Sequence, residues 1–230
     1  MSSPGRFIPG PGHREIIFLT GSGISARTGL GTFRGPDGLW ALEPETEEAM
    51  HADLLPGSLP RLWSVLWRMA SIALRHGPTP GHRAIARMGA QVITQNIDGL
   101  HQKAGSKRVY ELHGSVWRNH CLSCGKSYSA EYIKESAGIP RCECGGIIKP
   151  DVVLYGEPLD EQTVLGAVRA IAGADLLIVA GTSLSVYPAA GFLEYFRGDH
   201  LVLINRDKTP LDGVAELVIH EKVGEVLSQL

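Results

Sequence analysis

The chain has 230 residues, of which 43% are hydrophobic and 20% charged, and its net charge is −2. This composition excludes an intrinsically disordered chain, and the length predicts one domain, or one domain that carries a small insertion. The near-neutral charge offers no polybasic surface, so we expect neither nucleic acid nor an anionic membrane as a partner. The N-terminal stretch has no apolar core of signal-peptide length, and no run approaches the roughly 18 consecutive apolar residues of a membrane helix. We therefore expect a soluble, cytoplasmic protein.

Apolar runs and helical patterns alternate along most of the chain after a loose, Pro- and Gly-rich lead-in at residues 1–14. The helical pattern at 59–74 carries an apolar stripe with Ser58 as its expected N-cap, and we expect core packing for Trp63 and Trp67. Near-continuous apolar composition predicts parallel strands buried on both faces at 15–20, 91–94, 175–180 and 201–204. The alternation predicts an α/β fold built on a doubly wound, Rossmann-like parallel sheet.

Residues 114–149 interrupt this rhythm with cysteines, turns and little periodicity, and we interpret them as an inserted module. The predicted domains are then a Rossmann-like domain formed by residues 15–113 and 150–230, and the module itself. The helical segment at about 45–76 is assigned to the smaller lobe.

Four cysteines lie within this module, as a C-x-x-C pair and a C-x-C pair, and they are Cys121, Cys124, Cys142 and Cys144. Four thiolates at such spacing are the ligands of a tetrahedral metal ion, and an all-cysteine set leaves no open position for a reacting water. The sequence therefore predicts one structural Zn²⁺. Four unrelated buried cysteines are the alternative.

A glycine-rich turn follows the first predicted strand, and it reads Gly21-Ser22-Gly23-Ile24-Ser25-Ala26. A strand, such a turn and then a helical stretch resemble a dinucleotide-binding fingerprint, although a turn with two glycines is common for other reasons. The chain continues into a Gly-rich loop at 29–38, where a dehydrogenase would show a second strand ending in an acidic residue. Hydride transfer is therefore disfavoured, and we expect a mobile lid over a bound dinucleotide.

Polar residues follow three of the predicted strands: Gln95, Asn96 and Asp98 after the second, Thr182 and Ser183 after the third, and Asn205 after the fourth. Ligands of open α/β sheets bind at this carboxyl edge, although helix capping would explain any one placement alone. His113 ends a probable strand just before the module, and a histidine there suits general-base work. The other eight of the nine histidines have no such context.

These pieces together resemble the sirtuin family of NAD-dependent protein deacylases. The motifs that carry the resemblance occur in the family's order, and they are TGSGISARTGLGTFRG (20–35), TQNIDGLHQKAG (94–105), ELHGS (111–115), the cysteine quartet, KPDVVLYGE (149–157), GTSLSVYPAA (181–190) and INRD (204–207). The resemblance implies a deacetylase that converts acetyl-lysine, NAD and water to lysine, nicotinamide and O-acetyl-ADP-ribose. It also implies NAD as co-substrate, one structural Zn²⁺, and acetylated proteins or peptides as partners. We expect a monomer.

The resemblance further implies roles for individual residues. His113, as the base, and Asn96 would be catalytic. The NAD-binding residues would be Gly21, Ser22, Gly23, Ile24, Thr32, Phe33, Arg34, Trp40, Gln95, Asn96, Ile97, Asp98, Gly181, Thr182, Ser183, Asn205, Arg206, Asp207 and Val223. The substrate peptide would pair with Val153, Leu154, Tyr155, Gly156, Glu157 and Val186.

Family members that prefer succinyl- or malonyl-lysine carry a Tyr and an Arg three residues apart after the lid. An ungapped alignment places Trp63 and Leu66 at these positions, and no tyrosine lies between the lid and residue 76. Because a carboxylate in an apolar pocket needs a cationic or hydroxyl partner, we expect a preference for acetyl. Two other functions are considered: transfer of ADP-ribose to a protein from the same NAD site, and a zinc-ribbon interaction module joined to a nucleotide-sensing domain.

Overall fold

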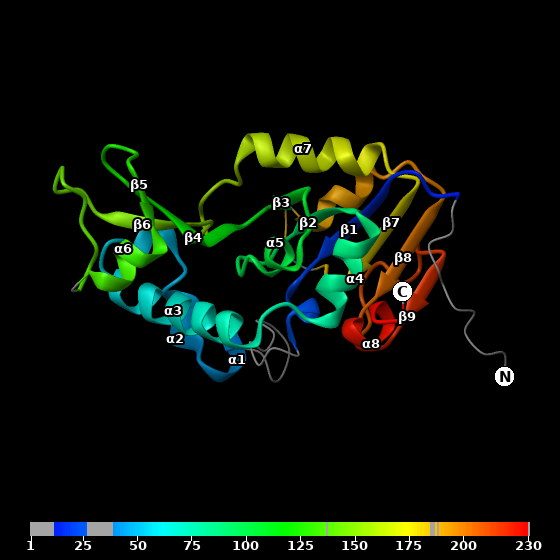
Figure 1. Cartoon of the computed structure of the whole chain (residues 1–230), viewed down its shortest axis with the longest axis horizontal. Helices are drawn as coiled ribbons and strands as arrows, with labels where there is room; N and C mark the ends of the chain where they lie inside the picture. Colours follow the sequence, from blue (N-terminus) through cyan, green and yellow to red (C-terminus); the bar gives the residue numbers. More distant parts are fainter. Residues whose placement is uncertain (1–11, 27–38, 137, 185–186, 188, 230) are drawn as a thin grey trace.

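The structure is a computed structural model that describes residues 12–26, 39–136, 138–184, 187 and 189–229. Figure 1 shows a large parallel sheet at one end of an elongated molecule and a second, small sheet at the other end. The long helix α7 (Glu161–Ala172) lies along one side of the large sheet. Within the described ranges, no helix combines the length and the apolar character needed to cross a membrane.

The large sheet has six strands in the order β3-β2-β1-β7-β8-β9, and every neighbouring pair is parallel. The strands are β1 (Ile16–Thr20), β2 (Gln91–Thr94), β3 (Val109–Glu111), β7 (Leu176–Ala180), β8 (His200–Ile204) and β9 (Leu217–Ile219). The four predicted strands are confirmed to within one residue at their ends. β9 was not predicted, because its apolar run of three residues, Leu217–Ile219, is too short to stand out as a strand.

Alternate residues of β1 point into two separate cores, which is the packing of a doubly wound sheet. Ile17 and Leu19 pack with α7 and with the 3-10 helix η4 (Ala189–Tyr195), whereas Phe18 packs on the opposite face. That opposite face is covered by α4 (Pro80–Met88) and α8 (Val223–Leu227). The order of the strands reverses between β1 and β7, and such a switch point is where open α/β sheets bind ligands. The predicted fold class is thus confirmed.

The small sheet is antiparallel and has three strands in the order β5-β4-β6. Its elements are β4 (Gly114–Cys121), β5 (Ser127–Ser129), the helix α6 (Ala130–Glu135) and β6 (Ile148–Val152). The helix α3 (Leu59–His76) packs its apolar stripe on this sheet, and Leu62 and Leu66 share a core with Val116 and Ile148. β6 crosses the expected boundary at residues 149 and 150, and the division into domains remains a prediction. The other helices are α1 (Leu39–Leu42), α2 (Pro44–Glu48), η3 (Ala52–Leu54) and α5 (Leu100–Ala104).

The start of α3 differs from the expected capped terminus. Ser58 has helical backbone angles, and its hydroxyl has no hydrogen-bond partner in the described part of the chain. Ser58 thus stands at the predicted N-cap position, but the predicted side-chain cap is wrong, because a capping side chain reaches the first turn from an extended backbone. The core packing of the tryptophans is confirmed, because Trp63 is buried, Trp67 is half-buried, and their rings stack 6.2 Å apart.

Candidate functional site

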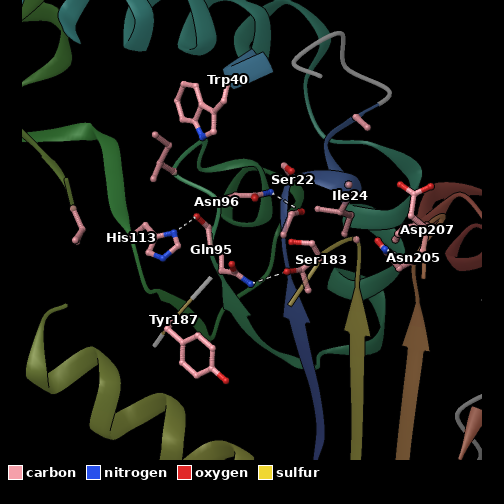
Figure 2. Close-up of a pocket in the computed structure, with 18 of the residues that line it drawn as sticks. Ser22, Ile24, Trp40, Gln95, Asn96, His113, Ser183, Tyr187, Asn205 and Asp207 are labelled. Atoms are coloured by element: carbon pink, nitrogen blue, oxygen red, sulfur yellow. Dashed lines mark hydrogen bonds between the residues drawn. The ribbon is translucent and has the colours of Figure 1, made fainter. Parts of the chain in front are cut away.

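A cavity of about 850 Å³ lies at the carboxyl ends of β1, β2, β7 and β8, between the large sheet and the small one. Figure 2 shows the side chains that surround it, among them Ser22, Asn96, His113 and Asn205. The volume falls within the roughly 300–1,000 Å³ typical of small-molecule and cofactor sites. The carboxyl ends of the strands therefore bring the separate polar motifs of the sequence together around one space.

Glycines allow two loops of this site to touch. The backbone N–H of Gly23 donates to the carbonyl of Gly181 (2.8 Å), and Gly181 has a positive φ of 67°. A Cβ at Gly21 would lie 2.7 Å from the Cβ of Thr182, and one at Gly23 would lie 2.7 Å from the Cα of Gly181. The glycines thus bring β1 and β7 loops into contact, and Ser22 and Ile24 of the 3-10 helix η1 (Ser22–Ile24) line the cavity.

Asn96 lies in a buried hydrogen-bond network that links the loops after β1 and β2. Its Nδ2 donates to the carbonyl of Gly21 and to the hydroxyl of Ser25, each at 3.2 Å, and Ser25 donates to Asp98 (2.7 Å). Burial raises the pKa of the Asp98 carboxyl, while the N–H of Leu100 and the Ser25 hydroxyl act in the opposite direction. Asn96 lines the cavity, whereas Asp98 does not lie among its described lining residues and instead supports Asn96 through Ser25.

His113 lines the cavity on the side of the small sheet, and a hydrogen bond to the backbone orients its ring. Its Nδ1 lies 2.9 Å from the carbonyl oxygen of Gln95, and a carbonyl only accepts, so Nδ1 carries the proton. The neutral ring therefore has its lone pair on Nε2. The side chain of Gln95 in turn donates to Thr182 Oγ1 (3.0 Å), which joins His113 to the loop after β7.

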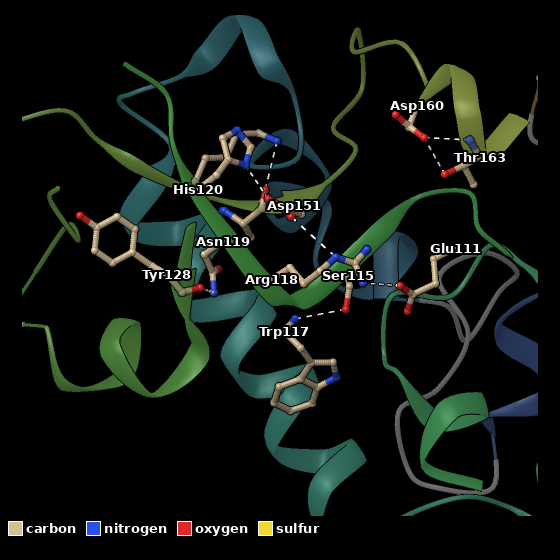
Figure 3. A network of polar contacts seen from close by, with 12 residues as sticks. Glu111, Ser115, Trp117, Arg118, Asn119, His120, Tyr128, Asp151, Asp160 and Thr163 are labelled. Carbon is tan, nitrogen blue, oxygen red and sulfur yellow. Dashed lines mark hydrogen bonds and ion pairs between the residues drawn. The ribbon is translucent and has the colours of Figure 1, made fainter. Parts of the chain in front are cut away.

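Backbone and polar contacts hold the chain on both sides of His113. Its carbonyl accepts from the N–H of Val153 (3.0 Å), and Gly114 follows with a φ of +72°. Figure 3 shows the adjoining network, in which Arg118 of β4 pairs with Glu111 of β3 (2.6 Å) and lies 3.7 Å from Asp151 of β6. These contacts tie the large sheet to the small one at the position of the histidine.

The segment at 153–157 forms another wall of the cavity. Tyr155 already pairs with residues 50–52, since its N–H donates to Met50 (2.8 Å) and its carbonyl accepts from Ala52 (3.0 Å). The carboxylate of Glu157 accepts from the buried Lys149 ammonium (2.9 Å) and from the N–H of Leu154 (2.8 Å). These hydrogen bonds hold the segment in place, and the backbone N–H and carbonyl of Tyr155 are already paired with another part of the chain.

Most residues expected at the site line this cavity, and they are Gly21, Ser22, Gly23, Ile24, Trp40, Gln95, Asn96, Ile97, His113, Val153, Leu154, Tyr155, Gly156, Glu157, Gly181, Thr182, Ser183, Asn205, Arg206, Asp207 and Val223. Thr32, Phe33, Arg34 and Val186 lie outside the described residues. The expected place of Trp63 and Leu66 in the acyl pocket is wrong, because both are buried in the core around α3 and neither lines the cavity.

Further residues line the cavity without having been predicted. Glu221, Lys222 and Gly224 follow β9, and polar residues at the carboxyl end of that strand would have been the signal, had the strand been recognised. The others are Ala26, Met50, Val152, Leu159 and Lys208. Several of these are apolar and carry no local signal of a site, because only the folded chain places them there.

The four cysteines converge at one end of the small sheet, and their sulfur atoms all lie within 4.8 Å of one another. Sγ atoms of Cys121 and Cys144 are 3.6 Å apart, and those of Cys124 and Cys142 are 3.5 Å apart. Four thiolates about 2.3 Å from a zinc ion would be separated by about 3.8 Å, so the quartet fits tetrahedral Zn²⁺. All four cysteines are described, and none lines the cavity, which agrees with a structural metal site.

Comparison with known proteins places this geometry in a family. The model of the Sir2 family matches residues 21–188. A relative named NAD-dependent protein deacetylase, from Cutibacterium acnes, is 46% identical over 93% of this chain and 91% of its own length. A Sir2 structure with a deacetylated p53 peptide and 3′-O-acetyl-ADP-ribose has a TM-score of 0.86 at 35% identity, with 94% of this chain and 92% of that chain covered. A Sir2 structure with a p53 peptide and NAD⁺ has a TM-score of 0.83 at 33% identity, with 95% and 92% covered. Because the family model matches most of the chain, and the sequence and fold match over more than nine-tenths of it, this chain belongs to the Sir2 family.

Proposed function

We propose that the protein is an NAD-dependent protein-lysine deacetylase that converts acetyl-lysine, NAD and water to lysine, nicotinamide and O-acetyl-ADP-ribose. The observation that carries the proposal is the single cavity in which the glycine loop after β1, Asn96, His113 and the edge at 153–157 meet. A dinucleotide and a peptide side chain can both enter this cavity, because it opens between the two sheets and the extended segment 153–157 forms one of its walls.

NAD fits this cavity in volume and in the polarity of its walls. When bound, NAD supplies the ADP-ribose that accepts the acetyl group, and nicotinamide leaves. Residues 21–24 would hold the pyrophosphate, where the short helix η1 begins, and Gln95 and Asn96 would hold the nicotinamide ribose and carboxamide. Residues 181–183 and 205–207 and Val223 would contact the adenosine half. The roles of Thr32, Phe33 and Arg34 at the nicotinamide end stay predictions.

His113 is suited to act as the general base. Because its Nδ1–H donates to the Gln95 carbonyl, Nε2 is the atom that accepts a proton from a ribose hydroxyl. The same bond fixes the tautomer and stabilises the imidazolium that forms when Nε2 takes up the proton. Asn96, held by three hydrogen bonds to its neighbours, orients the reacting ribose.

The acetylated peptide would lie in extended form along the edge at 153–157, with its acyl-lysine directed into the cavity. Since Tyr155 is already paired with residues 50–52, the peptide would use the remaining backbone groups of this edge. The role of Val186 stays a prediction. The apolar part of the cavity lining includes Trp40, Met50, Ile97 and Leu154, which suits an uncharged acyl group. The monomeric state and the cytoplasmic location also stay predictions.

Mass spectrometry of an acetyl-lysine peptide incubated with the protein and NAD tests the proposal. We expect loss of the acetyl group together with equal amounts of nicotinamide and O-acetyl-ADP-ribose. Controls without NAD, and with His113→Ala protein, should leave the peptide acetylated. NAD consumption with an ADP-ribosylated protein and an intact acetyl-lysine would support ADP-ribosyl transfer instead, and no NAD consumption at all would contradict both enzymatic functions.

A further inference from the structure

A chain of buried hydrogen bonds runs behind the cavity and ends at Asn96. The Nε2 of His101, on α5, lies 3.0 Å from the hydroxyl of Thr20, the last residue of β1. That hydroxyl lies 2.9 Å from the hydroxyl of Thr94, the last residue of β2, which accepts from the N–H of Asn96 (3.1 Å). His101, Thr20 and Thr94 are 1%, 0% and 2% exposed, and none of these three described residues lines the cavity.

The Thr20 hydroxyl is the centre of this chain, since it bonds both Thr94 and the Nε2 of His101. Whether the ring donates to Thr20 or accepts from it depends on the tautomer, and both tautomers of the neutral ring keep the bond. Burial lowers the pKa of the His101 imidazole to about 4, which keeps the ring neutral at physiological pH. Its ring packs edge-on against His82, 4.6 Å away, which fixes its position. The imidazole is therefore a neutral, fixed hydrogen-bond partner of Thr20.

Only part of this arrangement is local. The contact of Thr94 with Asn96 spans two residues, and any threonine at a strand end can make it. Thr20, however, is 74 residues from Thr94 and 81 residues from His101 in the sequence. These two contacts therefore exist only in the folded protein. Thr20 also accepts the N–H of Gln95 on its carbonyl (3.0 Å), and the next residue, Gly21, accepts the side chain of Asn96.

We propose that His101, Thr20 and Thr94 form a positioning unit that holds Asn96 for the reaction, and this role rests on the proposed deacetylase function. Within this unit, the Thr94 hydroxyl holds the backbone N–H of Asn96. Gly21 and Ser25 hold the Asn96 side chain at the cavity. The three residues touch neither the cavity nor the edge at 153–157, so they act on turnover through Asn96 and leave peptide binding unaffected.

Isosteric variants separate the hydrogen bonds from the packing. Thr20→Val and Thr94→Val remove a hydroxyl at constant shape, whereas Thr20→Ser and Thr94→Ser keep it. His101→Gln keeps a side chain of similar reach that can donate or accept a hydrogen bond, and His101→Met has similar length without such a group. Thr46→Val is the matched control, because Thr46 is an equally buried threonine (2% exposed) whose hydroxyl donates to Glu43, away from this unit.

We expect kcat to fall about ten- to a hundredfold in the Val and Met variants, which is the range that small misplacements near a reacting centre produce. The Ser and Gln variants should recover most of this loss, and the KM for the acetyl-peptide should stay at the wild-type value throughout. The double variant of Thr20→Val and His101→Met should lose no more than either single variant, since the residues act as one unit. Thr46→Val should keep the wild-type kcat.

Hydrogen exchange of the Asn96 backbone amide, measured by NMR on the protein without substrates, tests the same hydrogen bonds without depending on activity. Exchange should be faster in His101→Met and Thr20→Val than in His101→Gln and Thr20→Ser. Absence of deacetylation by the wild type would refute the proposed function, while this exchange result would still decide the positioning of Asn96. A wild-type kcat in folded Thr20→Val or His101→Met protein, additive losses in the double variant, or unchanged Asn96 exchange would each overturn the positioning unit.

Discussion

Gly114 is the position at which one added methyl group should do most damage to the proposed reaction. It follows His113, it has a φ of +72°, and a Cβ built on it would lie 1.6 Å from the carbonyl oxygen of Asp151. That is 1.4 Å closer than the 3.0 Å below which real Cβ contacts are essentially never found, so β4 and β6 must separate in a Gly114→Ala variant. This displacement occurs directly after His113, the proposed base. The carbonyl of His113 also accepts a hydrogen bond from Val153, so the displacement should move His113 as well.

Two contributions to the effect of Gly114→Ala can be separated with a second glycine. Gly89, at the end of α4, has a similar φ of +65° but open space around its Cβ position. An alanine in this backbone region costs about 1–2 kcal/mol, which both variants should show. Gly114→Ala should lose further stability through the broken strand pairing, and a displacement of about 1 Å at His113 should lower kcat/KM about a hundredfold.

Urea unfolding, zinc content and deacetylation rates of the two alanine variants measure these contributions. Gly89→Ala should keep wild-type kcat/KM with a modest loss of unfolding free energy. Equal stability and equal activity of the two variants would refute the steric reasoning. A Gly114→Ala protein with normal activity would also show that the position of His113 does not depend on the pairing of β4 with β6.

Four further predictions concern the metal, the base, the acyl group and acid stability. Cys142→Ser should lower zinc content and thermal stability together, because metal binding is coupled to folding in such sites, and full zinc occupancy would contradict the assignment. His113→Ala should lower turnover about 10²- to 10⁴-fold while the protein stays folded and zinc-loaded, and near-normal deacetylation would exclude His113 as the base. Acetyl-lysine should exceed succinyl-lysine in kcat/KM about a hundredfold or more, since an unpaired buried charge costs several kcal/mol, and equal rates on matched peptides would refute this preference. Burial lowers the pKa of His101 from 6.5 to about 4, so the stability it contributes is fully present above pH 6.5 and is lost as the pH falls toward 4. At about 1.4 kcal/mol per pH unit, this loss of unfolding free energy is about 3 kcal/mol. Urea unfolding between pH 7 and pH 4.5 should therefore show a steeper decline of the unfolding free energy in the wild type than in His101→Gln.

Local patterns were sufficient for the central strands and for the metal site. Residues 91–94 are a strand in the structure as they are in the sequence analysis, because a short apolar run buried on both faces carries its own signal. The cysteine spacing predicted the quartet for a similar reason, since each pair of ligands lies on one short turn. Polar residues that directly follow a buried strand, such as Asn96 and Asn205, were also predictable as members of one site, because parallel strands end at a common edge.

Contacts between distant segments were decided only by the tertiary structure. The histidines gave no reason to single out His101, because its partner Thr20 lies 81 residues away. Gly114 is one glycine among 28 in the sequence, and only the pairing of β4 with β6 makes it irreplaceable. Trp63 and Leu66 were expected at the acyl pocket, yet the packing of α3 on the small sheet buries both in a core. Apolar patterns along a chain specify which side chains are buried, whereas the partners of a buried side chain depend on how separate elements pack together, and this packing placed both the cavity and the supports behind it.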